Sequence, residues 1–234
     1  MKKLLRKFVS KFSKYSRIYE SAFDLAKTIN FFKIDLIIDI GASTGQYAKM
    51  LRRFGYEKYI FSIEPVSKSF KILNKNCSSD KKWSSKQCII SQQNKKKIKI
   101  NVSKDFDNSS ILNSTELHLK NHKGAEFFYT EEVDSKSLDQ LLNDDINVQK
   151  NMMLKIDTQG TESDILESGD TSLGKFKLIQ VELSIQKLYT NQKLWTDVVQ
   201  FMKEKEFDVW SIIPGYKQKD KGQLYQLDAI FYKK

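Results

Sequence analysis

Two glycines in a short turn after an apolar segment give the clearest indication of chemistry in the chain. Residues 36–40 are predicted to form a strand, and Gly41 and Gly45 follow it with three residues between them. Glycine lets a backbone turn tightly and lets a ligand come close. Asp39 lies at the carboxyl end of the strand, where open α/β sheets bind their ligands. The pattern predicts a loop that binds a small-molecule cofactor.

The spacing of the glycines disfavours a dinucleotide. A dinucleotide loop has the pattern Gly-x-Gly-x-x-Gly, and its middle glycine clears space for the pyrophosphate. Ser43 occupies that place here. The loop instead resembles the first motif of class I S-adenosylmethionine (SAM) methyltransferases, whose cofactor has no phosphate. The residues that we expect to bind SAM are Asp39, Gly41, Ala42, Ser43, Gly45, Gln46, Tyr47, Glu64 and Pro65.

Glu64 is expected to hold the ribose of the cofactor. It closes the next apolar segment, residues 59–63, and lies 23 positions after Gly41. In nucleotide-binding sheets, a carboxylate at this distance binds the ribose hydroxyls. Pro65 ends the strand directly after it.

A third acidic position is the candidate for catalysis. Asp157 ends the apolar segment 152–156, and Glu182 ends a neighbouring one. An alcohol is a poor nucleophile until its proton leaves, which requires a general base or a divalent cation. Asp157 could serve as either base or metal ligand, and with Glu182 it could bind Mg²⁺ or Mn²⁺ through hard oxygen ligands. Gln159 could hold acceptor hydroxyls. Asp157 has an alternative, purely structural role, which is to stabilise the N-terminus of the next helix.

Apolar and amphipathic segments alternate from residue 36 onward, which predicts an α/β fold with a mostly parallel sheet. We expect the last two strands to pair antiparallel because a short polar turn joins them. Expected strands span residues 36–40, 59–63, 87–91, 152–156, 176–183, 207–213 and 224–232, with a half-exposed one at 97–103 beside the sheet.

Two further segments surround the expected site. Residues 104–127 are polar and without periodicity, which predicts a loop over the site with solvated His118 and His122. Thr161 followed by Asp164 predicts a capping box at the start of a helix.

Length and composition favour one globular domain. A chain of 234 residues suits an α/β domain over 36–234 with an amphipathic helical extension over 1–35. The longest apolar runs fall far short of the eighteen residues or so that span a bilayer. The two cysteines have neither metal-site nor disulfide-framework spacing, which favours a reducing cytoplasm.

The net charge of +11 would fit nucleic-acid binding, but its distribution does not. About half of the excess lies in residues 1–20, where seven Lys and Arg residues face only Glu20. The rest is spread over the chain as solvated lysines. We therefore expect no nucleic-acid partner.

The basic segment at the N-terminus is predicted to be an amphipathic helix. Its apolar residues recur every three or four positions: Leu4, Leu5, Phe8, Phe12, Tyr15 and Tyr19. It lacks the apolar core and cleavage site of a secretory signal. Two roles stay open, namely packing on the domain as a lid or homodimer arm, and peripheral contact with the inner face of the membrane.

Several segments together resemble the FkbM-like family of SAM-dependent methyltransferases. The most specific is residues 154–162, Leu-Lys-Ile-Asp-Thr-Gln-Gly-Thr-Glu, although Thr158 departs from the usual Val. The others are residues 38–47, 63–65, 108–112, 181–183, 188–189 and 226–231. The resemblance implies a Rossmann-like class I fold, a mostly parallel seven-stranded sheet with an antiparallel C-terminal strand.

The resemblance also implies the reaction, which is methyl transfer to a hydroxyl, in many members that of a sugar in a surface glycan or glycolipid. Amino-methylating nucleic-acid enzymes of this fold carry an Asn/Asp-Pro-Pro-Tyr motif that this chain lacks. Three alternatives stay open: a polyketide or other secondary-metabolite acceptor, a non-catalytic module that uses the fold for binding, and a nicotinamide-dependent oxidoreductase.

Overall fold

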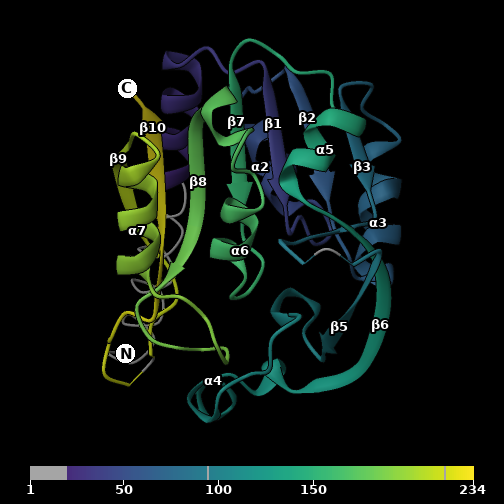
Figure 1. Ribbon diagram of the computed structural model, residues 1–234, viewed down its shortest axis with the longest axis vertical. Helices are drawn as coiled ribbons and strands as arrows, with labels where there is room; N and C mark the ends of the chain where they lie inside the picture. The colour runs from purple at the N-terminus through teal and green to yellow at the C-terminus, as the bar shows by residue number, and fades with distance from the viewer. Residues whose placement is uncertain (1–19, 94, 219) are drawn as a thin grey trace, which may run out of the picture.

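The computed structural model describes residues 20–93, 95–218 and 220–234. A large sheet flanked by helices forms the body of the molecule, and a smaller sheet lies at one end of it (Figure 1). Residues 20–31 are helical. The predicted helix over residues 1–19 lies outside the described residues. In the part of the chain that is described, no helix has the length and apolarity needed to cross a membrane.

The main sheet confirms the expected α/β Rossmann-like class. It has seven strands in the order β3-β2-β1-β7-β8-β10-β9. Pairing is parallel from β3 through β8, and β10 runs antiparallel to both β8 and β9. The strands are β1 (Leu36–Ile40), β2 (Tyr59–Ile63), β3 (Trp83–Lys86), β7 (Met152–Ile156), β8 (Phe176–Ser184), β9 (Phe207–Pro214) and β10 (Gln226–Lys233).

The two central strands explain why the sheet forms here. Every residue of β1 and of β7 is buried, as expected for parallel strands that are covered on both faces. Each strand carries one charged residue, and the register places Asp39 of β1 beside Lys155 of β7. A buried acid and a buried base are therefore neighbours under the carboxyl end of the sheet.

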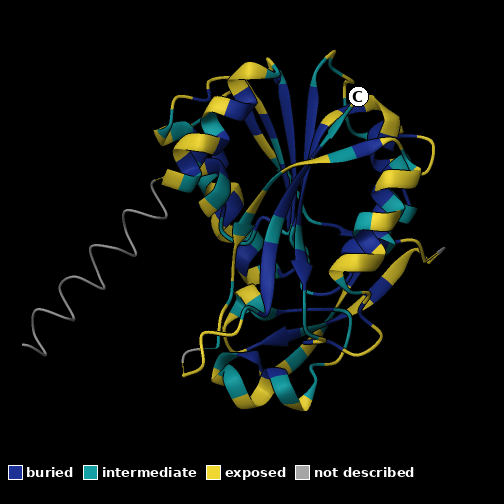
Figure 2. Ribbon diagram, turned by 90° about the vertical axis from the view of Figure 1, so that its left-hand side faces the viewer, coloured by how far each residue is buried: buried dark blue, intermediate teal, exposed yellow. Residues whose placement is uncertain are grey.

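Helices cover both faces of the sheet (Figure 2). One apolar cluster joins the sheet to α5 (Leu138–Asp144), α6 (Glu162–Glu167) and α7 (Trp195–Glu204). The other joins it to α2 (Gln46–Arg53), α3 (Ser67–Cys77) and the helix of residues 20–31 through Leu25 and Ile29. Both clusters contain buried residues of β1, so this strand sits in the middle of the core.

The smaller sheet lies beyond the carboxyl ends of the parallel strands (Figure 1). It consists of β4 (Ile89–Ile90), β5 (Lys97–Ser103) and β6 (Phe127–Lys136), and β5 pairs antiparallel with β6. The segment between β5 and β6 contains the short helices η1 (Phe106–Asn108), α4 (Glu116–Asn121) and η2 (Lys123–Ala125). We call this segment, residues 104–126, the cap.

Two sequence predictions need correction, and one strand was missed. The third strand of the main sheet is β3 and not residues 87–91. Strand β3 is polar apart from the buried Trp83, so it lacks the apolar pattern of a strand, whereas Ile89 and Ile90 belong to the smaller sheet. Residues 104–127 are not a structureless loop, since Thr115 caps α4 by accepting the backbone N–H of His118 at 3.3 Å. Strand β6 was not predicted because most of its residues are polar or exposed.

Candidate active site

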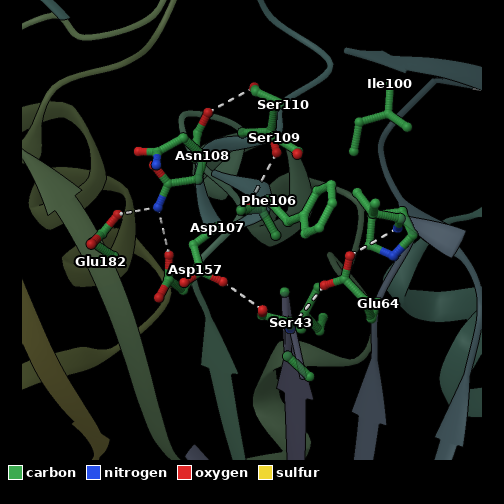
Figure 3. Close-up of a pocket in the computed structure, with 18 of the residues that line it drawn as sticks. Ser43, Glu64, Ile100, Phe106, Asp107, Asn108, Ser109, Ser110, Asp157 and Glu182 are labelled. Atoms are coloured by element: carbon green, nitrogen blue, oxygen red, sulfur yellow. Dashed lines mark hydrogen bonds between the residues drawn. The ribbon is translucent and has the colours of Figure 1, made fainter. Parts of the chain in front are cut away.

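A pocket of about 650 Å³ lies between the carboxyl ends of the parallel strands and the cap (Figure 3). Seven of the nine predicted cofactor residues line it, and so do all three predicted catalytic residues. Asp39 and Gly45 do not lie on its walls. The lining residues among the predicted ones are Gly41, Ala42, Ser43, Gln46, Tyr47, Glu64, Pro65, Asp157, Gln159 and Glu182.

The two glycines of the loop are required for different structural reasons. Gly41 has a φ of 81°, and a Cβ there would lie 1.8 Å from the carbonyl oxygen of Asp157. Only glycine therefore lets the ends of β1 and β7 meet at the pocket. Gly45 has a φ of 88°, and a Cβ there would lie 2.6 Å from the ring of Trp83. Its role is to pack the loop over that ring.

Glu64 ties the glycine loop to the end of β2. Its Oε2 accepts the backbone N–H of Ser43 and its Oε1 accepts that of Val66, each at 2.8 Å. Burial raises the pKa of Glu64 to about 7, although these two hydrogen bonds oppose the shift. A carboxylate has about four acceptor positions, so Glu64 keeps acceptor capacity for a ligand in the pocket that it lines.

Lys155 neutralises part of the acidic floor. Its Nζ lies 3.2 Å from Oδ2 of Asp157 and 3.5 Å from Oδ1 of the fully buried Asp39. Burial alone would lower the pKa of Lys155, but the two carboxylates hold it above its usual value. Asp39 is therefore placed to fix Lys155 from below the pocket wall.

Gln159 joins the two candidate catalytic carboxylates. Its Nε2 donates to Oδ1 of Asp157 at 2.9 Å and to Oε2 of Glu182 at 3.0 Å. Its Oε1 accepts the hydroxyl of Tyr189 at 2.9 Å. The side chain is thus held from three directions, although its backbone has a φ of 58° that non-glycine residues rarely adopt. Such strain, held in place by many contacts, is typical of functional sites.

Burial favours the neutral form of Glu182. Burial raises its pKa well above the usual value, and the nearby charges of Asp157 and Asp228 raise it further. Its Oε2 also accepts from Nε2 of Gln226 at 2.6 Å. Because Oε2 accepts two hydrogen bonds, Oε1 is the oxygen left to carry a proton. Burial, together with Asp157, likewise raises the pKa of Asp228 to about 6.

The turn that presents Gln159 is built by Glu162. Oε1 of this buried carboxylate accepts the backbone N–H groups of Thr158 and Gly160, both at 3.0 Å. The hydroxyl of Thr161 donates to that of Thr158 at 2.9 Å and makes no cap hydrogen bond. The predicted capping box of Thr161 and Asp164 is therefore wrong. Strand β7 ends at Ile156, and both Asp157 and Gln159 line the pocket within the next three residues. The hydrogen bonds of Glu162 hold the backbone in the tight turn that this requires.

Comparison with known proteins agrees with this site. The model of the methyltransferase FkbM domain matches residues 39–209, most of the chain and all of the turn just described. This chain belongs to the FkbM methyltransferase family. The resemblance drawn from the sequence is confirmed.

One curated relative of this FkbM methyltransferase is the 2-O-methyltransferase NoeI of Sinorhizobium fredii (strain NBRC 101917 / NGR234). It is 24% identical over 163 residues, which cover 67% of this chain and 66% of NoeI. The match thus spans slightly less than two thirds of the length of that relative.

Solved methyltransferases have a similar arrangement of elements. TrmK of M. capricolum in complex with S-adenosyl-homocysteine has a TM-score of 0.47 and 10% identity, covering 90% of this chain and 67% of that one. Ribosomal protein L11 methylase of Lactobacillus delbrueckii subsp. bulgaricus has a TM-score of 0.48 and 10% identity, covering 91% and 77%. At this level of likeness neither structure bears on the acceptor of the FkbM chain.

The predicted metal site does not fit the side chains found here. Over residues 20–93, 95–218 and 220–234, no group of three His, Cys, Asp or Glu side chains is arranged to hold a metal ion. Asp157 and Glu182 instead share the amide nitrogen of Gln159, which is a donor and cannot ligate a cation. We therefore assign no step of the FkbM reaction to Mg²⁺ or Mn²⁺.

The cap adds residues to the pocket that the sequence patterns did not single out. Oγ of Ser43 donates to Oδ1 of Asp107 at 2.5 Å, and Oγ of Ser110 donates to the carbonyl of Gln159 at 2.8 Å. The glycine loop and the turn that carries Gln159 are thus both tied to the cap. The serine-rich segment 108–112, noted above as part of the family resemblance, was the available sign of this role.

His118 was predicted to be solvated, and that prediction is wrong. It is 2% exposed, lines the pocket together with His122 and packs edge-on against Tyr189 with ring centroids 4.9 Å apart. Burial, and then the neighbouring His122, lower the pKa of His118 to about 4. Its imidazole is therefore neutral near pH 7. The spacing of four residues, which places two side chains on one face of a helix, was the sign in the sequence, although α4 ends at Asn121 and His122 directly follows it.

Proposed function

We propose that this FkbM methyltransferase transfers the methyl group of SAM to a hydroxyl oxygen, with a sugar of a surface glycan or glycolipid as the acceptor. The observation that supports this best is that a single pocket joins a glycine loop and Glu64 to the linked side chains of Asp157, Gln159 and Glu182. The first group suits a nucleoside and the second suits a hydroxyl-bearing acceptor.

The first half of the pocket fits SAM better than a dinucleotide. Glu64 offers acceptor positions for ribose hydroxyls, and apolar Val66, Ile89 and Ile90 beside it suit a purine ring. Ser43 takes the place of the pyrophosphate glycine, and its hydroxyl is bonded to the acidic Asp107. A pyrophosphate brought there would meet this carboxylate, whereas SAM has no phosphate and carries a net positive charge.

The second half of the pocket suits a polyhydroxylated acceptor. Its walls carry carboxyl, amide and imidazole groups in place of an apolar surface: Asp157, Gln159, Gln180, Glu182, Gln226, Asp228, His118 and His122. Such groups hydrogen-bond to sugar hydroxyls. The name of the relative NoeI, a 2-O-methyltransferase, supports oxygen as the atom that is methylated.

The proposed chemistry follows from these contacts. SAM, when bound, supplies a methyl group on a sulfonium, and the acceptor oxygen displaces S-adenosyl-homocysteine from it. Asp157 takes the proton that the hydroxyl loses, so a methyl ether, S-adenosyl-homocysteine and one proton are formed. The amide of Gln159 keeps the Asp157 carboxylate in place, and the neutral Glu182 donates from Oε1 to orient the acceptor. Orientation of this kind supplies a large part of the rate of a displacement.

Mass spectrometry of a purified reaction tests the proposal. The full chain is incubated with SAM labelled in the methyl group and with a panel of acceptors: deoxy-sugar and hexose oligosaccharides, polyhydroxylated polyketides and RNA. We expect label on an oxygen of an oligosaccharide, and labelling that is about a hundredfold or more slower with the Asp157→Asn variant. Label on nitrogen, label on RNA alone, or SAM binding without transfer to any acceptor would overturn it. The last result would indicate a binding module.

A further inference from the structure

The two edges of the main sheet differ in how they are protected. Strand β3 forms one edge and is short, with Ser84, Ser85 and Lys86 following Trp83. Strand β9 forms the other edge and is twice as long (Figure 1). From Val209 to Pro214 it carries no charged residue. Natural proteins keep such edges from pairing by short strands, charges, prolines or bulges.

Pro214 at its end and a register shift at Trp210 give β9 part of this protection, but the edge is apolar on both faces. Val209, Trp210 and Ile212 are 40%, 42% and 54% exposed. A register shift at Trp210 is the only irregularity in its pairing with β10, and residues 211–214 stay regular. Trp210 stacks on Phe31, itself 70% exposed, with ring centroids 5.7 Å apart. The apolar surface therefore continues from the strand onto the helix of residues 20–31.

The backbone of β9 restricts what can cover this surface. Over the described residues, β9 has a strand neighbour on one side only, which is β10. The outward N–H and C=O groups need hydrogen-bond partners if they become buried. A lipid surface offers none in its apolar layer. The occupant that satisfies both the side chains and the backbone is another strand.

The charges at the ends of β9 suit a second copy of the same strand. Glu206 directly precedes the strand and Lys217 follows its end, whereas Asp208 is paired with Lys234 of its own chain at 2.6 Å. Antiparallel pairing about a two-fold axis brings Glu206 of one copy to Lys217 of the other. The uncharged middle lets two chains that each carry a net charge of +11 approach without lysines facing each other.

We propose that two copies of this chain dimerise by antiparallel pairing of their β9 strands. The two main sheets then continue into one another across a two-fold axis. The interface is of the isologous type, in which the same patch of each subunit meets itself. Trp210, Ile212 and Phe31 of each copy become covered.

Sedimentation velocity of the full chain at micromolar concentration tests this dimer. We expect a dimer for the wild type. The Ile212→Lys variant should weaken dimerisation by about a hundredfold or more, because like charges then face each other across the two-fold axis. Phe128→Lys is the matched control, since Phe128 is 76% exposed on β6 and should leave the dimer intact. Melting temperature and SAM binding, measured for both variants, show that each is folded.

Cross-linking gives a second measurement that does not depend on a weakened interface. Single cysteines placed at Ser211, Ile212 and Ile213 should include at least one that forms a disulfide-linked dimer under mild oxidation, since facing residues of antiparallel strands lie about 4.5–5.5 Å apart at Cα. Phe128→Cys should form none. The native Cys77 and Cys88 are buried.

Several results would overturn the proposal. A monomeric wild-type chain contradicts it, and so does a dimer that Ile212→Lys leaves unchanged. A monomer that binds vesicles of anionic phospholipid through Trp210 and Ile212 would show a membrane as the occupant. A chain that self-associates through β9 only after removal of residues 1–19 would show that its own N-terminal segment covers the edge.

Discussion

Asp157 and Glu182 come from neighbouring strands and accept hydrogen bonds from one and the same nitrogen, Nε2 of Gln159, at 2.9 and 3.0 Å. The two carboxyl groups nevertheless differ. Asp157 is also paired with Lys155 at 3.2 Å, whereas burial and then its acidic neighbours raise the pKa of Glu182 well above the usual value. This difference separates a proton acceptor from a hydrogen-bond donor within a single network.

The difference predicts unequal effects of two conservative substitutions. Asp157→Asn should lower kcat by about a hundredfold or more while SAM affinity stays within a few-fold, because it removes the proton acceptor. Glu182→Gln should lower kcat by less than about tenfold, because an amide replaces a group that is already neutral and can still donate. Steady-state kinetics and calorimetry on both variants check this. If Glu182→Gln is the more damaging of the two, the assigned roles are reversed.

Glu64 should make stability depend on pH. Its pKa is raised from 4.5 in the unfolded chain to about 7 in the folded one, so its contribution to stability is present below pH 4.5 and is lost as pH rises through 7. Glu64→Gln cannot ionise and avoids this loss. Between about pH 5 and pH 8, the free energy of unfolding of the variant should rise relative to the wild type by about 2–3 kcal/mol. Urea unfolding of both proteins at pH 5 and pH 8 measures this change. If the variant and the wild type differ by the same free energy of unfolding at both pH values, the pKa of Glu64 is not raised in the folded protein.

Chelators should leave methyl transfer unchanged. The amide of Gln159 lies between the two carboxylates that a cation would need, and no third ligand joins them among the described side chains. Activity after dialysis against EDTA, and after adding back Mg²⁺ or Mn²⁺, should equal that of the untreated protein. A loss that either cation restores would show that Gln159 moves aside and that the two carboxylates bind metal.

The pocket location of the residues at strand ends was predictable, because the carboxyl ends of parallel strands meet at the same edge of the sheet. Buried apolar segments ending in Asp39, Glu64, Asp157 and Glu182 belong to adjacent strands, and the order of the segments was enough to bring the last three to one pocket. The place of Asp39 beneath the wall was not predictable, since one residue of register decides which face a side chain occupies.

Contacts between side chains from distant segments were much less accessible from the sequence. Ser43 meets Asp107 across 64 positions, and Tyr189 meets Gln159 across 30, with no periodic pattern linking either pair. The role of Glu162 was likewise not predictable, because its reach back to the N–H groups of Thr158 and Gly160 depends on a turn in which Gln159 and Gly160 have positive φ. Short-range patterns describe elements, whereas these contacts depend on how elements pack.

Calorimetric titration of the purified chain with SAM, S-adenosyl-homocysteine and NAD tests the central claim most directly. We predict that the first two bind at one site, that NAD does not, and that Glu64→Ala weakens SAM by about 1–3 kcal/mol without unfolding the protein, because the ribose then loses its hydrogen-bond partner. Binding of NAD with no binding of SAM or S-adenosyl-homocysteine would contradict the claim.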